Sequence, residues 1–305
     1  MKKLNKVFLF LLLFPFFINA QETIELYRIV PNSKQTDIKE DFTNGMYRNT
    51  ITPTLEIYLP EDKKESMPAV VICPGGGYSV VVYGGEGVMT AKEFVKHGVA
   101  AFVLKYRLPD DATMQDKKIG PLQDAQQAIK IVRENAEKWG VDPDKIGIIG
   151  FSAGGHLAST CATHFQKSLI ENSNNTSLRP DFQILVYPVI SMQDELTHKD
   201  SRTKLLGENP SEEDIQLFSN ELQVDENSPP AYLTHSADDN LVDVDNSIEY
   251  FEKLRKNKVP VEMHIYPKGG HGFIFRHKGW TDPLFKWMYD SEILISDETE
   301  NETNN

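Results

Sequence analysis

Short apolar runs alternate with helical stretches from residue 53 onward, and this alternation restricts the possible folds more than any other feature. The runs occupy residues 53–60, 68–73, 100–106, 145–150, 181–188, 230–236 and 261–267. The first alternates like a half-exposed strand, whereas most of the others are short, apolar on both faces and rich in β-branched residues, as in a covered parallel sheet. The helical stretches occupy residues 89–97, 120–139, 154–166, 245–257 and 280–293. The pattern predicts an α/β fold with a doubly wound, mostly parallel sheet and helices on both faces.

Three segments lie outside this alternation. Residues 1–20 combine three lysines, an apolar core and Ala20, which predicts a secretory signal peptide; twelve apolar residues interrupted by Pro15 are too few for a membrane anchor. Residues 189–229 form an insertion that is either a helical cap over a pocket or a solvated surface excursion. The acidic residues 296–305 predict a disordered tail. We therefore expect one folded domain over residues 21–295.

Charge and cysteine content narrow the possible partners. The formal charge of −13 argues against nucleic-acid binding, which needs a basic surface. No later segment is apolar enough to span a bilayer, so we expect a secreted or periplasmic protein; the oligomeric state stays open. Cys73 and Cys161 predict two buried free thiols rather than a disulfide, and neither belongs to a CxxC pair that would indicate zinc or redox chemistry.

The stretch "GIIGFSAGGH" (147–156) places one serine, Ser152, where an apolar run ends and a helix is expected to begin. Gly150 and Gly154 flank it in the spacing G-x-S-x-G. A serine in a strained strand-to-helix turn brings neighbouring chain so close that both flanking positions must lack side chains. The alternative is a helix N-cap, which needs a hydroxyl but no flanking glycines. The context favours a nucleophile.

A nucleophilic serine needs a base and an orienting acid, which in this topology follow it in the chain. The glycine-rich loop "KGGHGF" offers His271 as the base. Its rivals are less well placed: His97, His156 and His164 lie on expected helices, His264 lies within a strand, and His235 and His277 lack a glycine-flanked loop. "SADDNLV" offers Asp238 or Asp239 as the acid. Proximity to the strand end favours Asp238, with Asp239 kept as the alternative.

Backbone amides could stabilise the negative charge that develops on the substrate oxygen. The amide of Ala153 lies next to the serine, and "PGGGY" (74–78) follows the strand 68–73. Amides approach a substrate oxygen closely only where side chains are missing. A phosphate cradle is disfavoured because no lysine follows as in GxxxxGK[ST], and the stretch is not a G-x-G-x-x-G dinucleotide motif.

The ordered set "CPGGGY", "LKYRLP", "PLQDAQQAI", "GFSAGGH", "SADDNLV" and "KGGHGF" resembles the α/β-hydrolases. Within them it resembles the acetyl-xylan-esterase-like or feruloyl-esterase-like (BD-FAE-type) serine esterases, related to the hormone-sensitive-lipase esterases, over residues 50–293. The resemblance implies Ser152 as nucleophile, Asp238 as acid and His271 as base. It also implies that Gly76, Gly77 and Ala153 form the oxyanion hole. Pro74 stands where the related lipases have histidine, and Asp243 where many relatives have proline.

The expected function is a secreted serine esterase that needs no metal or cofactor. The resemblance implies that it removes acetyl or feruloyl groups from polysaccharide or oligosaccharide fragments. The alternatives are a general short-chain carboxylesterase, a serine peptidase of the prolyl-oligopeptidase type, and a non-catalytic carbohydrate-binding protein. Five aromatic residues could stack on sugar rings, although core packing is the more common role of such residues: Tyr78, Tyr83, Tyr187, Trp280 and Trp287.

Overall fold

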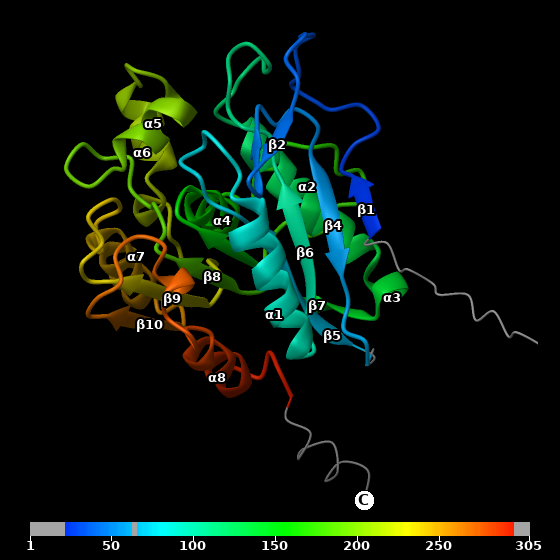
Figure 1. Cartoon of the computed structure of the whole chain (residues 1–305), viewed down its shortest axis with the longest axis vertical. Helices are drawn as coiled ribbons and strands as arrows, with labels where there is room; N and C mark the ends of the chain where they lie inside the picture. The colour runs from blue at the N-terminus through cyan, green and yellow to red at the C-terminus, as the bar shows by residue number, and fades with distance from the viewer. Residues whose placement is uncertain (1–21, 63–65, 296–305) are drawn as a thin grey trace, which may run out of the picture.

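The computed structural model describes residues 22–62 and 66–295, so the expected signal peptide (1–20) and acidic tail (296–305) lie outside the described residues. An eight-stranded sheet with the order β1-β4-β6-β5-β7-β8-β9-β10 forms the centre of the molecule (Figure 1). Its strands are β1 (Glu22–Glu25), β4 (Thr54–Tyr58), β5 (Met67–Cys73), β6 (Ala100–Lys105), β7 (Val141–Phe151), β8 (Gln183–Val186), β9 (Ala231–Ser236) and β10 (Val261–Tyr266).

Six neighbouring strands of this sheet, β6 to β10 with β5 among them, run parallel, and β4 and β1 are added antiparallel at one edge. Strands β5, β6, β8 and β9 are buried along their whole length, which explains why their sequences are apolar on both faces. The expected fold class, a mostly parallel α/β-hydrolase sheet, is therefore confirmed. A separate hairpin, β2 (Asp41–Thr43) with β3 (Met46–Arg48), was not expected from the sequence.

Helices cover both faces of the sheet. Figure 1 shows α1 in front of the sheet and α2 and α4 behind it. The helices are α1 (Met89–Lys96), α2 (Gly120–Glu134), α3 (Ala136–Trp139), α4 (Ala153–Thr163), α5 (Lys199–Leu206), α6 (Glu212–Phe218), α7 (Asp245–Lys256) and α8 (Asp282–Asp290), with short turns η1 (Tyr83–Val88), η2 (Asn220–Leu222) and η3 (Phe273–Phe275). The stretch 120–139, expected as one helix, is divided at Asn135. None of the helices in the described part of the chain combines the length and apolar character needed to cross a bilayer.

Two features of the core follow from the strand pattern. Cys73 and Cys161 are both free and buried, as the sequence predicts. Arg107, two residues after the end of β6, is also buried and pairs with Asp124 of α2, whose Oδ1 lies 2.8 Å from Arg107 Nη2. The Arg107 amide donates a further bond to Asp124 Oδ2. This pair attaches α2 to the end of β6, since a buried charge must be matched by a partner.

The insertion 189–229 contains α5, α6 and η2, which gather at the side of the molecule away from β1 (Figure 1). Asn220 attaches η2 to α4, because its side-chain amide donates to the His156 carbonyl and to two hydroxyls of α4. His156, also on α4, lies between two other segments. Its Nε2 lies 2.8 Å from the carbonyl oxygen of Phe218, and its Nδ1 lies 2.9 Å from the Tyr78 hydroxyl. The insertion is thus hydrogen-bonded to the helix that follows Ser152.

The protonation state of His156 follows from these partners. The Phe218 carbonyl can only accept, so Nε2 carries the proton and the Tyr78 hydroxyl donates to Nδ1. Burial lowers the pKa of His156 to about 4, so the ring is neutral near neutral pH. Protonation at Nδ1 would reverse this bond, so that the Tyr78 hydroxyl would have to accept and its own proton would lose its acceptor in a buried site.

The lowered pKa of His156 predicts that the free energy of unfolding decreases as the solution becomes acidic. The folded pKa of His156 lies below the ordinary imidazole value of about 6.5. In the window between these values the unfolded chain binds more protons, so the stabilisation is present above pH 6.5 and is lost as pH falls through 4. We expect the parent to lose about 3 kcal/mol more unfolding free energy than His156→Gln between pH 7 and pH 4. Denaturant unfolding at both pH values measures the difference; equal losses in the two proteins would contradict it.

Candidate active site

Ser152 occupies the turn between β7 and α4 with φ 51° and ψ −121°, a strained conformation for a residue other than glycine. The flanking glycines are required by close packing. A Cβ on Gly150 would lie 2.1 Å from the Gly154 carbonyl oxygen, and one on Gly154 would lie 2.1 Å from the Cys73 carbonyl oxygen. The Ser152 side chain caps no amide of α4, so the N-cap alternative is not supported.

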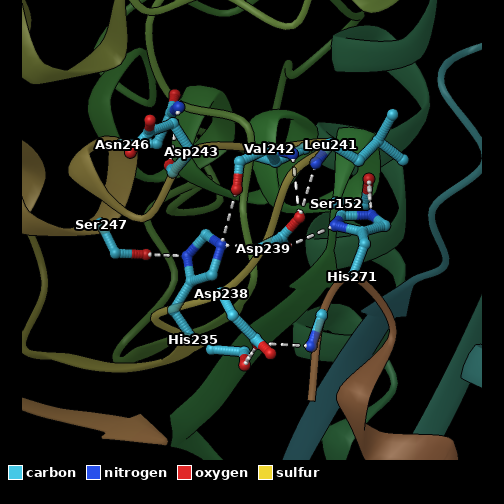
Figure 2. Close-up of polar contacts among 12 residues, drawn as sticks. Ser152, His235, Asp238, Asp239, Leu241, Val242, Asp243, Asn246, Ser247 and His271 are labelled. Atoms are coloured by element: carbon cyan, nitrogen blue, oxygen red, sulfur yellow. Dashed lines mark hydrogen bonds and ion pairs between the residues drawn. The ribbon is translucent and has the colours of Figure 1, made fainter. Parts of the chain in front are cut away.

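The Ser152 hydroxyl instead meets an imidazole. Ser152 Oγ lies 2.9 Å from His271 Nε2, and His271 Nδ1 lies 2.7 Å from Oδ2 of Asp239 (Figure 2). His271 follows β10 on a loop whose Gly269, Gly270 and Gly272 all have positive φ. The side chain of His271 is 20% exposed and that of Asp239 is fully buried. Such a series of contacts can move a proton from the serine hydroxyl to the imidazole while the carboxylate holds the ring.

The choice of Asp238 as the acid is wrong. Asp238 Oδ1 accepts bonds from the Ser236 hydroxyl and from the amides of Gly269 and Gly270, and Figure 2 shows it directed away from His271. The reason is the turn after β9. The Asp239 amide donates to the Ser236 carbonyl, and this reversal places the second aspartate, not the first, towards His271. Asp238 shapes the loop that carries His271.

Asp239 is held by four donors. Oδ1 accepts from the amides of Leu241 and Val242, and Oδ2 accepts from His271 and, at 3.2 Å, from Nε2 of His235. Burial alone would raise the pKa of Asp239, but hydrogen bonds from His235 and His271 and from the Val242 amide hold it well below its usual range. Asp239 is therefore ionised throughout the range in which a histidine base works.

His235 lies on β9, on the far side of Asp239 from His271 (Figure 2). Its Nε2 faces two acceptors, Asp239 Oδ2 and the Val242 carbonyl, so this nitrogen carries a proton. Its Nδ1 lies 2.8 Å from the Ser247 hydroxyl on α7. The fully buried His235 therefore acts through Asp239, because it fixes the direction of the carboxylate that orients His271.

The glycine loop after β5 lies against the serine. A Cβ on Gly75 would lie 2.9 Å from Ser152 Cβ, and one on Gly154 would lie 2.4 Å from the Pro74 carbonyl oxygen. Among the described residues, no hydrogen-bond acceptor pairs with the amides of Gly76 and Gly77. The amide of Ala153 is the first of α4 and has no partner within the helix. The three amides proposed for an oxyanion hole thus come from two segments that touch beside Ser152; their role stays a prediction.

Glu86, within η1, is hydrogen-bonded to the glycine loop. Its Oε2 accepts from the Gly75 amide at 2.6 Å, and its Oε1 accepts from the Tyr187 hydroxyl at 2.9 Å. Burial raises the pKa of Glu86, and these two hydrogen bonds oppose the rise. The Tyr187 ring lies 4.8 Å from that of His271, centroid to centroid. Glu86 therefore connects the glycine loop to Tyr187, which packs on His271.

A hollow of about 850 Å³ lies elsewhere, at the opposite ends of the parallel strands. It is bordered by Met67 at the start of β5, Lys145 in the first half of β7 and Tyr289 of α8, and it contains none of the residues described above. Over residues 22–62 and 66–295, no group of three histidine, cysteine, aspartate or glutamate side chains is arranged to hold a metal.

Comparison with known proteins identifies the family. The BD-FAE family model matches residues 55–254. The chain belongs to the BD-FAE family. It is 37% identical over 237 residues to endo-1,4-beta-xylanase B of Butyrivibrio fibrisolvens, covering 75% of this chain and 36% of that protein. It is 38% identical over 222 residues to the acetylxylan esterase of Xylanibacter ruminicola, covering 72% of this chain and 43% of that protein. It thus spans less than half the length of these two relatives.

A solved structure extends the comparison over nearly the whole chain. The acetyl ester-xyloside bifunctional hydrolase of Caldicellulosiruptor lactoaceticus is 35% identical, with a TM-score of 0.75, and the match covers 90% of this chain and 98% of that one. An esterase of Thermogutta terrifontis, 22% identical with a TM-score of 0.70 over 92% of this chain and 95% of that one, shares the fold. The BD-FAE domain therefore has the α/β-hydrolase architecture expected from its motifs.

The structure agrees with core packing as the role of the aromatic residues considered for sugar stacking in this BD-FAE domain. Tyr78, Tyr83, Tyr187 and Trp287 are buried and pack within the core, and Trp280 is partly buried against it. The four buried rings therefore offer no open face for a sugar. Sequence reasoning missed Glu86, which was visible only as the single acid in "YGGEG", and it treated His235 as a rival base rather than as a partner of the acid.

Proposed function

We propose that this BD-FAE chain is a serine carboxylic-ester hydrolase that removes acetyl, or feruloyl, groups from polysaccharide or oligosaccharide fragments. The observation that carries the proposal is the contact series Ser152–His271–Asp239, with 2.9 Å and 2.7 Å between the paired atoms. The relatives named an acetylxylan esterase and an acetyl ester-xyloside hydrolase favour an acetylated glycan as substrate. The lysine-led apolar segment 1–20 favours export from the cytoplasm.

The first step of the proposed reaction forms a tetrahedral intermediate on Ser152. Ser152 Oγ attacks the ester carbonyl carbon while His271 Nε2 takes the hydroxyl proton. Ionised Asp239 holds the Nδ1 proton of His271 and stabilises the imidazolium that forms. The carbonyl oxygen becomes negatively charged and is bound by the amides of Gly76, Gly77 and Ala153, and donors of this kind contribute about 3 to 4 kcal/mol each.

The later steps release both products, and the acyl-enzyme forms when the alcohol leaves. His271 gives its proton to the oxygen of the departing alcohol, and the bond between this oxygen and the carbonyl carbon breaks. A water molecule then attacks the acyl carbon while His271 takes one of its protons, and the Ser152 oxygen leaves with that proton restored. The products are the free acid and the deacylated carbohydrate. The proposal requires no metal or cofactor.

The test compares substrates that share the ester but differ in the alcohol or acyl group. Acetate release is measured from acetylated xylan, acetylated xylo-oligosaccharides, another acetylated polysaccharide and 4-nitrophenyl acetate, and ferulate release from feruloylated xylan fragments. We expect kcat/KM to be highest on an acetylated glycan. Turnover of the aryl ester with none of any glycan would instead identify a general short-chain carboxylesterase. No turnover of any ester would favour a carbohydrate-binding protein.

A further inference from the structure

A histidine of the insertion lies beside the glycine loop. His198 is the residue before α5, and its imidazole lies next to Gly77. A Cβ built on Gly77 would lie 3.9 Å from His198 Cε1 and within 4 Å of no other atom outside its immediate neighbours. The space in front of Gly77 is therefore bounded by this imidazole. Because Gly77 is itself a proposed oxyanion donor, a bound ester would lie close to His198.

One ring nitrogen of His198 is fixed and the other is not. Nδ1 lies 2.8 Å from the hydroxyl of Ser201, and Ser201 is fully buried in the first turn of α5. Within the described residues, no partner lies within hydrogen-bond distance of Nε2. The ring is half-buried. The Ser201 contact therefore orients the ring, while Nε2 stays available to a ligand.

The charge state of His198 suits a neutral polar ligand. Burial lowers the pKa of His198, and the charge of His271 acts in the same direction while Asp200 and Asp239 oppose it. A neutral imidazole can donate from Nε2 if the Ser201 hydroxyl donates to Nδ1, or accept at Nε2 if Nδ1 carries the proton. Either state can bind a hydroxyl group, which both donates and accepts.

His198 is not a second base for Ser152, because the serine hydroxyl is already paired with His271 Nε2. Nor is it suited to hold an acetyl methyl group, since covering its free nitrogen with a methyl group would leave a buried polar atom unpaired. The part of the ester that is left for His198 to bind is the alcohol group. In an acetylated carbohydrate, the carbon next to the ester-bearing carbon commonly carries a free hydroxyl.

We propose that Nε2 of His198 binds the hydroxyl adjacent to the ester and thereby selects polyol and carbohydrate acetates over simple esters. This inference rests on the proposed esterase function and deepens it by naming a specificity residue. A second polar surface involves the residues that follow Gly77 in the chain. A small hollow of about 70 Å³ is lined by Tyr78 and Ser79 after Gly77, by Lys204 of α5 and by Asp110. Further hydroxyls of a longer substrate would meet these groups.

The test uses two esters that differ by one hydroxyl: trans-2-hydroxycyclohexyl acetate and cyclohexyl acetate. The parent is expected to prefer the hydroxy ester in kcat/KM by about tenfold, the effect of one hydrogen bond at a site built for it. His198→Leu is expected to lose this preference through KM, with cyclohexyl acetate hydrolysed at the parent rate within about twofold. His198→Gln, which keeps a polar group of similar reach, is expected to retain part of the preference. Comparing ratios cancels any difference in intrinsic reactivity between the two esters.

Two further variants separate specificity from structure. Ser201→Ala, which releases the ring, is expected to give an intermediate preference. His264→Leu removes a histidine on β10 that bonds to Glu262, and it is expected to behave as the parent. An equal loss on both esters in His198→Leu and His198→Gln would overturn the proposal and indicate support of the glycine loop. An unchanged preference in His198→Leu, or no preference in the parent, would also overturn it.

The same variants on acetylated xylo-oligosaccharides distinguish this proposal from the proposed function. We expect acetate release by His198→Leu to fall about tenfold there, again through KM. If the parent released no acetate from any glycan but still preferred the hydroxy ester through His198, the glycan assignment would fail and the role of His198 would stand. If the parent deacetylated glycans while His198→Leu did so equally well, the reverse would hold.

Discussion

Ester hydrolysis by the Ser152→Ala variant is expected to fall about a millionfold in kcat, to a rate set only by binding and by the amides of the glycine loop. The reason is that no other hydroxyl can replace it. Ser152 alone occupies the strained turn that directs Oγ to His271 Nε2 at 2.9 Å, and it is enclosed by Gly150 and Gly154, where no side chain fits. Stopped assays with 4-nitrophenyl acetate at high enzyme concentration measure the residual rate.

A fluorophosphonate probe provides a readout that does not depend on turnover. The serine oxygen displaces fluoride from phosphorus, so the parent should gain one phosphonyl group on the peptide that contains Ser152. Ser152→Ala should gain none, and Ser168→Ala, which removes an exposed serine away from the site, should label as the parent does. Labelling of Ser152→Ala at another serine together with retained turnover would show that the nucleophile lies elsewhere.

Much of the fold is determined locally and could therefore be predicted. The runs 68–73 and 100–106 are apolar because β5 and β6 are covered on both faces, and this burial is visible directly in the residue types. Ser152 could be located for the same reason. The close packing around it requires glycine at 150 and 154, and this requirement is visible in a stretch of five residues. The added antiparallel strand β1 and the hairpin β2–β3 were missed because their short sequences are largely exposed and carry little apolar pattern.

The parts that could not be predicted depend on contacts between distant segments. Glu86 accepts hydrogen bonds from Gly75 and Tyr187, and the His198 ring lies beside Gly77. These contacts form only when the chain folds, and no local sequence pattern indicates them. The choice of the orienting acid could not be predicted for the same reason, even though the two candidates are neighbours in the sequence. Whether Asp238 or Asp239 reaches His271 depends on how the turn after β9 closes, and a one-residue difference in that turn reverses the assignment.

The different roles of Asp238 and Asp239 can be measured by substituting asparagine for each of them in turn. Asp239→Asn is expected to lower kcat about ten-thousandfold, because an amide cannot replace a carboxylate that accepts four bonds. Oδ1 receives the amides of Leu241 and Val242, and Oδ2 receives His271 and His235, so one of these pairs would face an NH₂ group. If that pair includes His271, the imidazole would lose its acceptor at Nδ1 and favour the tautomer that cannot take the proton of Ser152.

Asp238→Asn is expected to lower kcat less than about tenfold. Its three donors, the Ser236 hydroxyl and the amides of Gly269 and Gly270, all reach Oδ1, and asparagine keeps one oxygen for them. Steady-state kinetics of both variants on 4-nitrophenyl acetate, with thermal unfolding to verify the fold, give the comparison. A loss in Asp238→Asn as large as that in Asp239→Asn would mean that the loop carrying His271 depends on the first aspartate as strongly as the imidazole depends on the second. Retention of more than about a tenth of the parent kcat by Asp239→Asn would remove this carboxylate from the reaction, because an acid that fixes the tautomer of the base cannot be so nearly dispensable.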